Sequence, residues 1–112
     1  MLVNLEFAFT LTEPTDRHKA KVQIWVDANG DQVMDAEEEV TPLVRSGRGW
    51  RGSYALEVAS VDRVGFLVRY TGAVGSQWAL TVWCDQPKRH EVYREKDTVR
   101  ADQGRIIGWC RG

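Results

Sequence analysis

The sequence predicts an all-β protein, built as one antiparallel β-sandwich with seven to eight strands. Apolar residues alternate with polar ones over short segments that recur about every 8–12 residues. No segment of twelve residues has a helical period, and glycine, proline and other turn-forming residues separate the alternating segments. A chain of 112 residues is long enough for one core and too short for two, so we expect one domain over 1–112.

Three strands are predicted in the first part of the chain. Over 3–11 the odd positions are apolar, and over 20–26 the even positions are apolar. The segment 40–44 contains Pro42, which has no N–H to donate within a central strand. We therefore place 40–44 at a sheet edge.

The alternation returns in the second part of the chain. Residues 50–58, 64–70 and 77–84 have an apolar residue at almost every second position. The segments 92–94 and 105–110 are shorter or less regular and are weaker strand candidates. Such a series of short strands is typical of an immunoglobulin-like sandwich.

The charges are balanced in number but unevenly distributed. The chain has 15 Lys and Arg against 16 Asp and Glu, a net charge of −1. Six of the acids lie between Asp27 and Glu39 with no base among them, which leaves the rest of the chain at +5. Proteins that bind nucleic acids usually carry a basic excess, so we expect no nucleic-acid partner.

We also expect no membrane partner. No segment approaches the ~18 consecutive apolar residues that a membrane helix needs. The first eleven residues alternate and have no basic start, unlike a signal peptide. If the chain is complete, the expected location is therefore cytoplasmic.

The acidic segment is the first candidate site. Oxygen-bearing side chains occupy positions 1, 3, 5, 9 and 12 of a twelve-residue frame: Asp27, Asn29, Asp31, Asp35 and Glu38. Calcium takes six to eight oxygen ligands, and this spacing wraps a chain around one ion. The segment resembles the calcium loops of EF-hand and dockerin proteins, although strands flank it here. Calcium is thus a candidate cofactor, and a plain solvated loop is the alternative, because Asn, Gly and Asp are also good turn residues.

The five tryptophans are the second candidate site. Trp50 and Trp78 share the phase of the apolar residues in their strands, whereas Trp25 and Trp83 are out of phase. Because each sheet of a sandwich buries one face, the out-of-phase tryptophans should be exposed or covered by a loop. An exposed aromatic ring can stack on the apolar face of a sugar, and exposed apolar patches often mark binding sites.

The order of motifs resembles the starch-binding β-sandwich modules of the CBM20 and CBM48 type. The resemblance covers about residues 3–90 and rests on five motifs: Thr41-Pro42-Leu43, Gly49-Trp50, Tyr54-Ala55-Leu56, Gly65-Phe66 and Gly75-Ser76-Gln77-Trp78. It implies a structural role for Trp50 and a sugar-stacking role for Trp78. Together with the phase analysis, it predicts a non-catalytic module that binds a glucan-type carbohydrate through Trp25, Trp78 and Trp83.

Two other functions stay open: a calcium-stabilised structural or adhesive sandwich, and a protein-interaction subunit. The partner is accordingly a polysaccharide or a protein, and the oligomeric state is left open. No nucleophile motif is present, and no pair of carboxylates is placed across a cleft, so we expect no catalysis.

The histidines and cysteines give no site of their own. His18 and His90 have no Cys or His neighbours at metal-ligand spacing, and we expect both to be exposed loop residues. Cys84 and Cys110 each follow a tryptophan. They form either a disulfide or two buried thiols.

Overall fold

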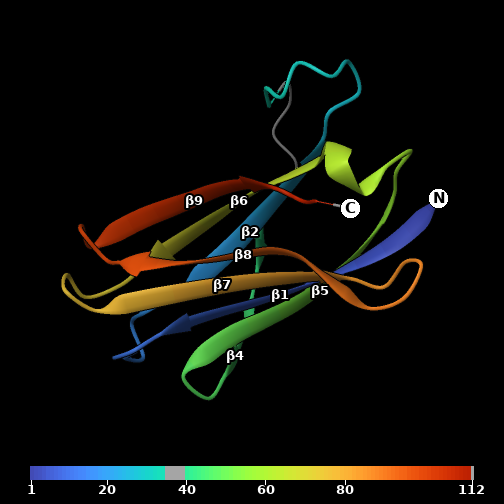
Figure 1. The fold of residues 1–112 in the computed structure, drawn as a ribbon. Helices are drawn as coiled ribbons and strands as arrows, with labels where there is room; N and C mark the ends of the chain where they lie inside the picture. The colour runs from blue at the N-terminus through green and yellow to red at the C-terminus, as the bar shows by residue number, and fades with distance from the viewer. Residues whose placement is uncertain (35–39, 112) are drawn as a thin grey trace.

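The computed structural model describes residues 1–34 and 40–111. Two antiparallel sheets pack face to face around a core, which confirms the predicted β-sandwich (Figure 1). The five-stranded sheet has the order β4-β5-β1-β7-β8, and the four-stranded sheet has the order β3-β2-β6-β9. The elements are β1 (Leu2–Leu11), β2 (Ala20–Val26), β3 (Thr41–Pro42), β4 (Val44–Ser46), β5 (Gly49–Glu57), a 3₁₀ turn η1 (Val61–Arg63), β6 (Val64–Thr71), β7 (Gln77–Cys84), β8 (His90–Thr98) and β9 (Gln103–Trp109). Within the described ranges, no helix is long and apolar enough to cross a membrane.

The described residues form nine strands, one more than predicted, because the predicted edge segment 40–44 is divided between the two sheets. β3 pairs with β2 in the four-stranded sheet, whereas β4 pairs with β5 in the five-stranded sheet. Leu43, between them, is buried and donates its backbone N–H to the carbonyl of Ala20 at 3.0 Å. The chain then turns into β5 at Gly47, whose φ of 62° suits a glycine in a two-residue hairpin loop.

The core is aromatic at its centre. Phe7, in β1, is fully buried and meets Phe66, in β6 of the opposite sheet, edge to face with ring centroids 5.5 Å apart. Phe9 lies beside the rings of Trp50 and Tyr70 at 5.7 and 5.2 Å. Alternation in β1 therefore places every second side chain between the sheets, as predicted.

β8 is much longer than the predicted segment 92–94. It runs from His90 to Thr98 as an edge strand, and its residues 94–98 are all exposed. Charged side chains are common on edge strands, where they discourage pairing with other chains. Because both sides of this part of β8 meet solvent, it lacks the apolar alternation by which strands are recognised.

Both cysteines are free thiols and both are buried. Burial, together with the neighbouring Cys84, raises the pKa of Cys110 to about 12. The structure therefore favours two thiols over the disulfide, and the Cys110 thiol stays protonated at neutral pH.

His18 is buried, so the expectation of an exposed loop histidine was wrong for it. Its Nδ1 accepts a hydrogen bond from the backbone N–H of Thr15 at 2.8 Å. Burial, and after it the charges of Arg17 and Arg45, lowers the pKa of His18 below the usual 6.5. The imidazole ring of His18 is thus neutral in the folded protein at neutral pH.

The protein should lose stability as the pH falls below about 6.5. The lowered pKa means that the unfolded state binds more protons at His18 in this range, so the free energy of unfolding decreases as the pH falls. Urea unfolding at pH 7.5 and 5.5 measures the loss. His18→Asn keeps an acceptor near Nδ1 but does not titrate, so it should lose less stability than the wild type. Equal losses in both proteins would contradict the prediction.

Candidate ligand-binding site

Trp78 lies in the core. It is 7% exposed, and its ring stacks on that of Phe9, with centroids 6.4 Å apart. Its position on the inner face of β7 agrees with its phase. Such a ring presents no free face, so the sugar-stacking role that the resemblance implies for Trp78 is not supported by its position.

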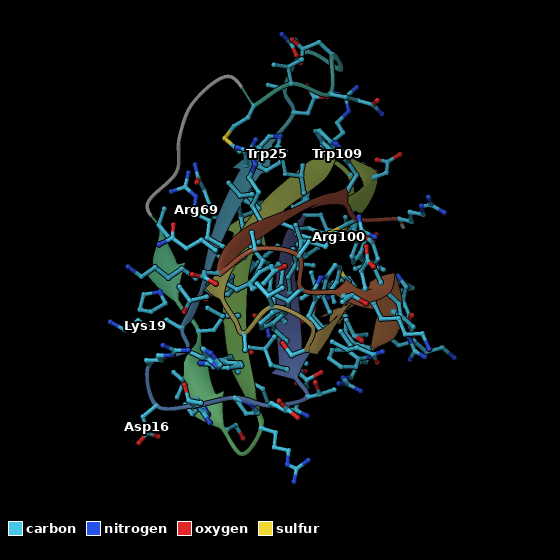
Figure 2. All side chains as sticks on the ribbon, turned by 90° about the vertical axis from the view of Figure 1, so that its left-hand side faces the viewer. Asp16, Lys19, Trp25, Arg69, Arg100 and Trp109 are labelled. Atoms are coloured by element: carbon cyan, nitrogen blue, oxygen red, sulfur yellow. The ribbon has the colours of Figure 1, made fainter. Side chains whose placement is uncertain are left out.

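Trp25 lies on the outer face of β2, as its phase predicts, but it is covered and only 5% exposed. Its ring lies over Gly65 of β6, where a Cβ atom would come within 2.4 Å of two ring carbons. Trp109 of β9 packs edge-on against it, with ring centroids 5.3 Å apart (Figure 2). Trp25 therefore supports Trp109 and offers no surface of its own.

Trp83 lies on the outer face of β7 and is half-buried, in agreement with its phase. The guanidinium of Arg89 covers its ring at 4.6 Å from the centroid. Arg89 also pairs with Glu6 at 3.3 Å, and Arg51 pairs with the same carboxylate at 3.1 Å. Trp25, Trp78 and Trp83 thus occupy three different environments and do not form one platform.

In the acidic segment, the side chains bind the loop's own backbone. Asp27 is buried, and its carboxylate accepts the N–H groups of Gly30 and Gln32, both at 2.8 Å. Asn29 and Asp31 hydrogen-bond to each other. Burial acts to raise the pKa of Asp27, but the backbone N–H groups, led by that of Gln32, outweigh it and lower the pKa.

These contacts are those of an ordered turn. Among the residues that the structure describes, no group of three or more His, Cys, Asp or Glu side chains is placed to hold a metal. Two predicted ligands, Asp35 and Glu38, lie outside the described residues. Calcium binding by Asp27, Asn29 and Asp31 therefore stays a prediction.

A pocket of about 540 Å³ lies at the open edge of the sandwich, between β8, the edge strand of one sheet, and β9, the edge strand of the other. Its lining consists of Glu91, Val92, Tyr93, Arg94, Gly108, Trp109 and Arg111. The backbone N–H of Arg111 donates to the carbonyl of Val92 at 2.9 Å, which ties the C-terminal segment to β8. The pocket is therefore bounded by β8 on one side and by β9 with the C-terminal segment on the other.

Two half-buried aromatic residues, Tyr93 and Trp109, line this pocket. Tyr93 packs its ring on Phe66 edge to face, with centroids 4.8 Å apart. It fits there because Gly108 has no side chain; a Cβ atom at Gly108 would lie 2.6 Å from Phe66 and 2.7 Å from Tyr93. Trp109 is held by Trp25 as described above. Each ring is thus held by a second aromatic ring, Phe66 for Tyr93 and Trp25 for Trp109, and each residue is partly exposed to solvent.

Charged groups stand beside the two rings. Arg94 pairs with Glu91 at 2.8 Å, and Arg111 lies near Tyr93. The Tyr93 hydroxyl donates to the carboxylate of Glu95. Burial, followed by Glu95, raises the pKa of Tyr93 above its usual value, so the hydroxyl stays protonated at neutral pH.

Reasoning from the sequence missed this pocket. Trp109 is out of phase with Ile106, Gly108 and Cys110, and this phase could have identified it as a residue of the outer face. No comparable signal exists for Tyr93 or Arg111, because the pocket forms only where two edge strands of different sheets meet. Trp50, by contrast, is buried, as the structural role predicted for it requires. Comparisons of the chain with protein-family models, curated proteins and solved structures give no significant match.

Proposed function

We propose that this protein is a non-catalytic carbohydrate-binding β-sandwich whose ligand occupies the pocket between β8 and β9. The observation that carries the proposal is the pair of half-buried aromatic residues, Tyr93 and Trp109, next to three charged side chains in one pocket. Binding pockets typically combine apolar walls with a few polar groups that fix the orientation of the ligand. A sugar ring has this dual character, with apolar C–H faces and a rim of hydroxyl groups.

The charged side chains of the pocket can form hydrogen bonds with the hydroxyl groups of a sugar. Arg94 and Arg111 offer several N–H donors each, and Glu91 offers carboxylate acceptors. Glu91 is the single carboxylate among the described residues that line the pocket, and it is already paired with Arg94. Glycoside hydrolysis usually needs two carboxylates across the bond to be cleaved. The pocket is therefore better suited to holding a sugar than to hydrolysing it.

Truncation of the larger ring should weaken binding strongly. We expect Trp109→Ala to bind its carbohydrate about 30-fold more weakly, since removing a central aromatic contact typically costs about 2 kcal/mol or more. Affinity electrophoresis measures this in gels that contain starch, glycogen, a mixed-linkage β-glucan or a polyuronate. Thermal unfolding of the variant checks that it remains folded at the temperature of the gel.

Trp83→Ala is the matched control, because it removes a half-buried tryptophan from the outer face of the other sheet. It should migrate like the wild type in every gel. If Trp83→Ala is impaired and Trp109→Ala is not, the site is at Trp83. If none of the gels retards the wild type, the proposed function is wrong.

A further inference from the structure

The edges of the two sheets differ in how well they are protected against pairing with another strand. The edge strands are β4 and β8 in one sheet and β3 and β9 in the other. An edge strand presents a row of unpaired N–H and C=O groups, and proteins usually prevent its pairing by keeping it short or by placing charges or proline on it.

Three of these edge strands carry such protection. β3 and β4 have only two and three residues, and β3 also contains Pro42. β8 is longer, but four consecutive residues of it are charged and exposed: Arg94, Glu95, Lys96 and Asp97. Pairing of a further strand with β3, β4 or β8 is therefore disfavoured.

β9 lacks this protection. It lies at the margin of its sheet, beside β6 (Figure 1). Its seven residues include no proline, and Arg105 is the single charged residue among them. Ile107, in the middle of the outer face, is 55% exposed. Within the described part of the chain, β9 is thus the edge strand most open to pairing.

The backbone groups of β9 that point away from β6 are unused. Cys110 donates its N–H to the carbonyl of Val64 at 3.0 Å, and Gly72 donates its N–H to the carbonyl of Asp102 at 2.8 Å. Hydrogen-bonded positions alternate along an antiparallel pair, so the even-numbered residues of β9 bond to β6 and the odd-numbered ones, from 103 to 109, point outward. In the described ranges, these outward groups form no hydrogen bond with another segment.

The open edge has a defined end. Arg111 continues the outward phase of β9, and its N–H donates to the carbonyl of Val92 in β8 at 2.9 Å. The edge is therefore occupied by the chain itself at Arg111. A further strand can lie beside residues 103–109.

We infer that β9 pairs with β9 of a second copy of this chain, antiparallel and about a two-fold axis at Ile107. The two Ile107 side chains are then opposite each other, and each Arg105 is opposite Trp109 of the other copy. The pairing covers the exposed isoleucines, and a guanidinium group beside an indole ring is a favourable contact. The two four-stranded sheets become one continuous sheet. This inference is independent of the proposed carbohydrate function.

The side chains favour this register over its neighbours. A two-fold axis at Arg105 would place two guanidinium groups directly opposite each other, and opposed like charges destabilise a sheet. An axis at Ile106 would place each Ile107 opposite a charged Arg105. With the axis at Ile107, the same patch serves both copies, and the pairing closes as a dimer without leaving β9 free for a third copy.

Sedimentation equilibrium of the protein without carbohydrate tests the association. The contact is small, so we expect a weak dimer with a dissociation constant on the order of 10–100 μM. Ile107→Lys should weaken dimerisation about tenfold or more, because the two-fold axis places the two new lysines opposite each other. Thermal unfolding checks that the variant remains folded. The matched control is Val44→Lys, which adds the same charge at a 73% exposed valine on edge strand β4 and should dimerise like the wild type.

Cross-linking tests the register. In the dimer of Ile107→Cys, the two new thiols lie opposite each other with Cβ atoms about 5 Å apart, so a short bis-maleimide should join the two chains. The native thiols, Cys84 and Cys110, are buried and should not react. Val44→Cys is the control and should remain a single chain.

Three results would overturn the inference. A wild type that is still monomeric at about 1 mM would exclude the second copy and leave the β9 edge to a strand of another protein. Equal dissociation constants for Ile107→Lys and Val44→Lys would show that β9 is not the interface. Equal cross-linking of Ile107→Cys and Val44→Cys would show that the two Ile107 positions are not opposite each other.

Discussion

Phe7→Ala should destabilise the protein by about 3–5 kcal/mol, the usual cost of removing a buried phenylalanine ring. Phe7 has no exposed surface, and it meets Phe66 at 5.5 Å and Tyr54 at 5.7 Å, both edge to face. Its removal leaves a cavity between the sheets and breaks two aromatic contacts. Domains of this size have a total stability of about 5–15 kcal/mol, so the variant should be close to unfolding.

Urea unfolding followed by circular dichroism measures this loss. Leu2→Ala is the matched control, since Leu2 belongs to the same strand but is 63% exposed. It should change the free energy of unfolding by less than about 0.5 kcal/mol. A loss below about 1 kcal/mol in Phe7→Ala would show that Phe7 is not at the centre of the core.

Gly65→Ala should destabilise the protein by about 1–3 kcal/mol, the range for overpacking. The new Cβ atom would lie 2.4 Å from Cε2 and Cζ2 of Trp25, so the indole ring must move. Alanine is otherwise the better strand residue by roughly 0.5–1 kcal/mol, so a loss would come from the contact and not from the backbone. Because Trp25 packs against Trp109, the substitution should also weaken the carbohydrate binding that we propose for the β8–β9 pocket.

A double-mutant cycle separates the contact from other effects. In a Trp25→Leu background the smaller side chain leaves room, and the cost of Gly65→Ala should largely disappear. Gly72→Ala is the control for adding a methyl group, because the nearest atoms to its Cβ would be 3.4 Å away, in Leu11 and Val99. An undiminished cost in the Trp25→Leu background would contradict the explanation.

The alternation in the sequence is sufficient to predict the sandwich, most of its strands and the face on which each tryptophan lies. Trp50 and Trp78 are on inner faces, and Trp25 and Trp83 are on outer faces, as their phases require. The uneven charge distribution also shows in advance that the chain outside the acidic segment is basic. These features are local, because the direction of a side chain on a strand depends only on its position along that strand.

Burial and proximity were decided by the tertiary structure alone. Trp25 is covered because Gly65 on the next strand has no side chain and because Trp109, 84 residues further along the chain, packs against it. The pocket between β8 and β9 needs the edge strands of two different sheets to lie side by side. Which strands pair across long separations in sequence depends on how the whole core packs. The alternation within a single strand therefore does not predict its partners.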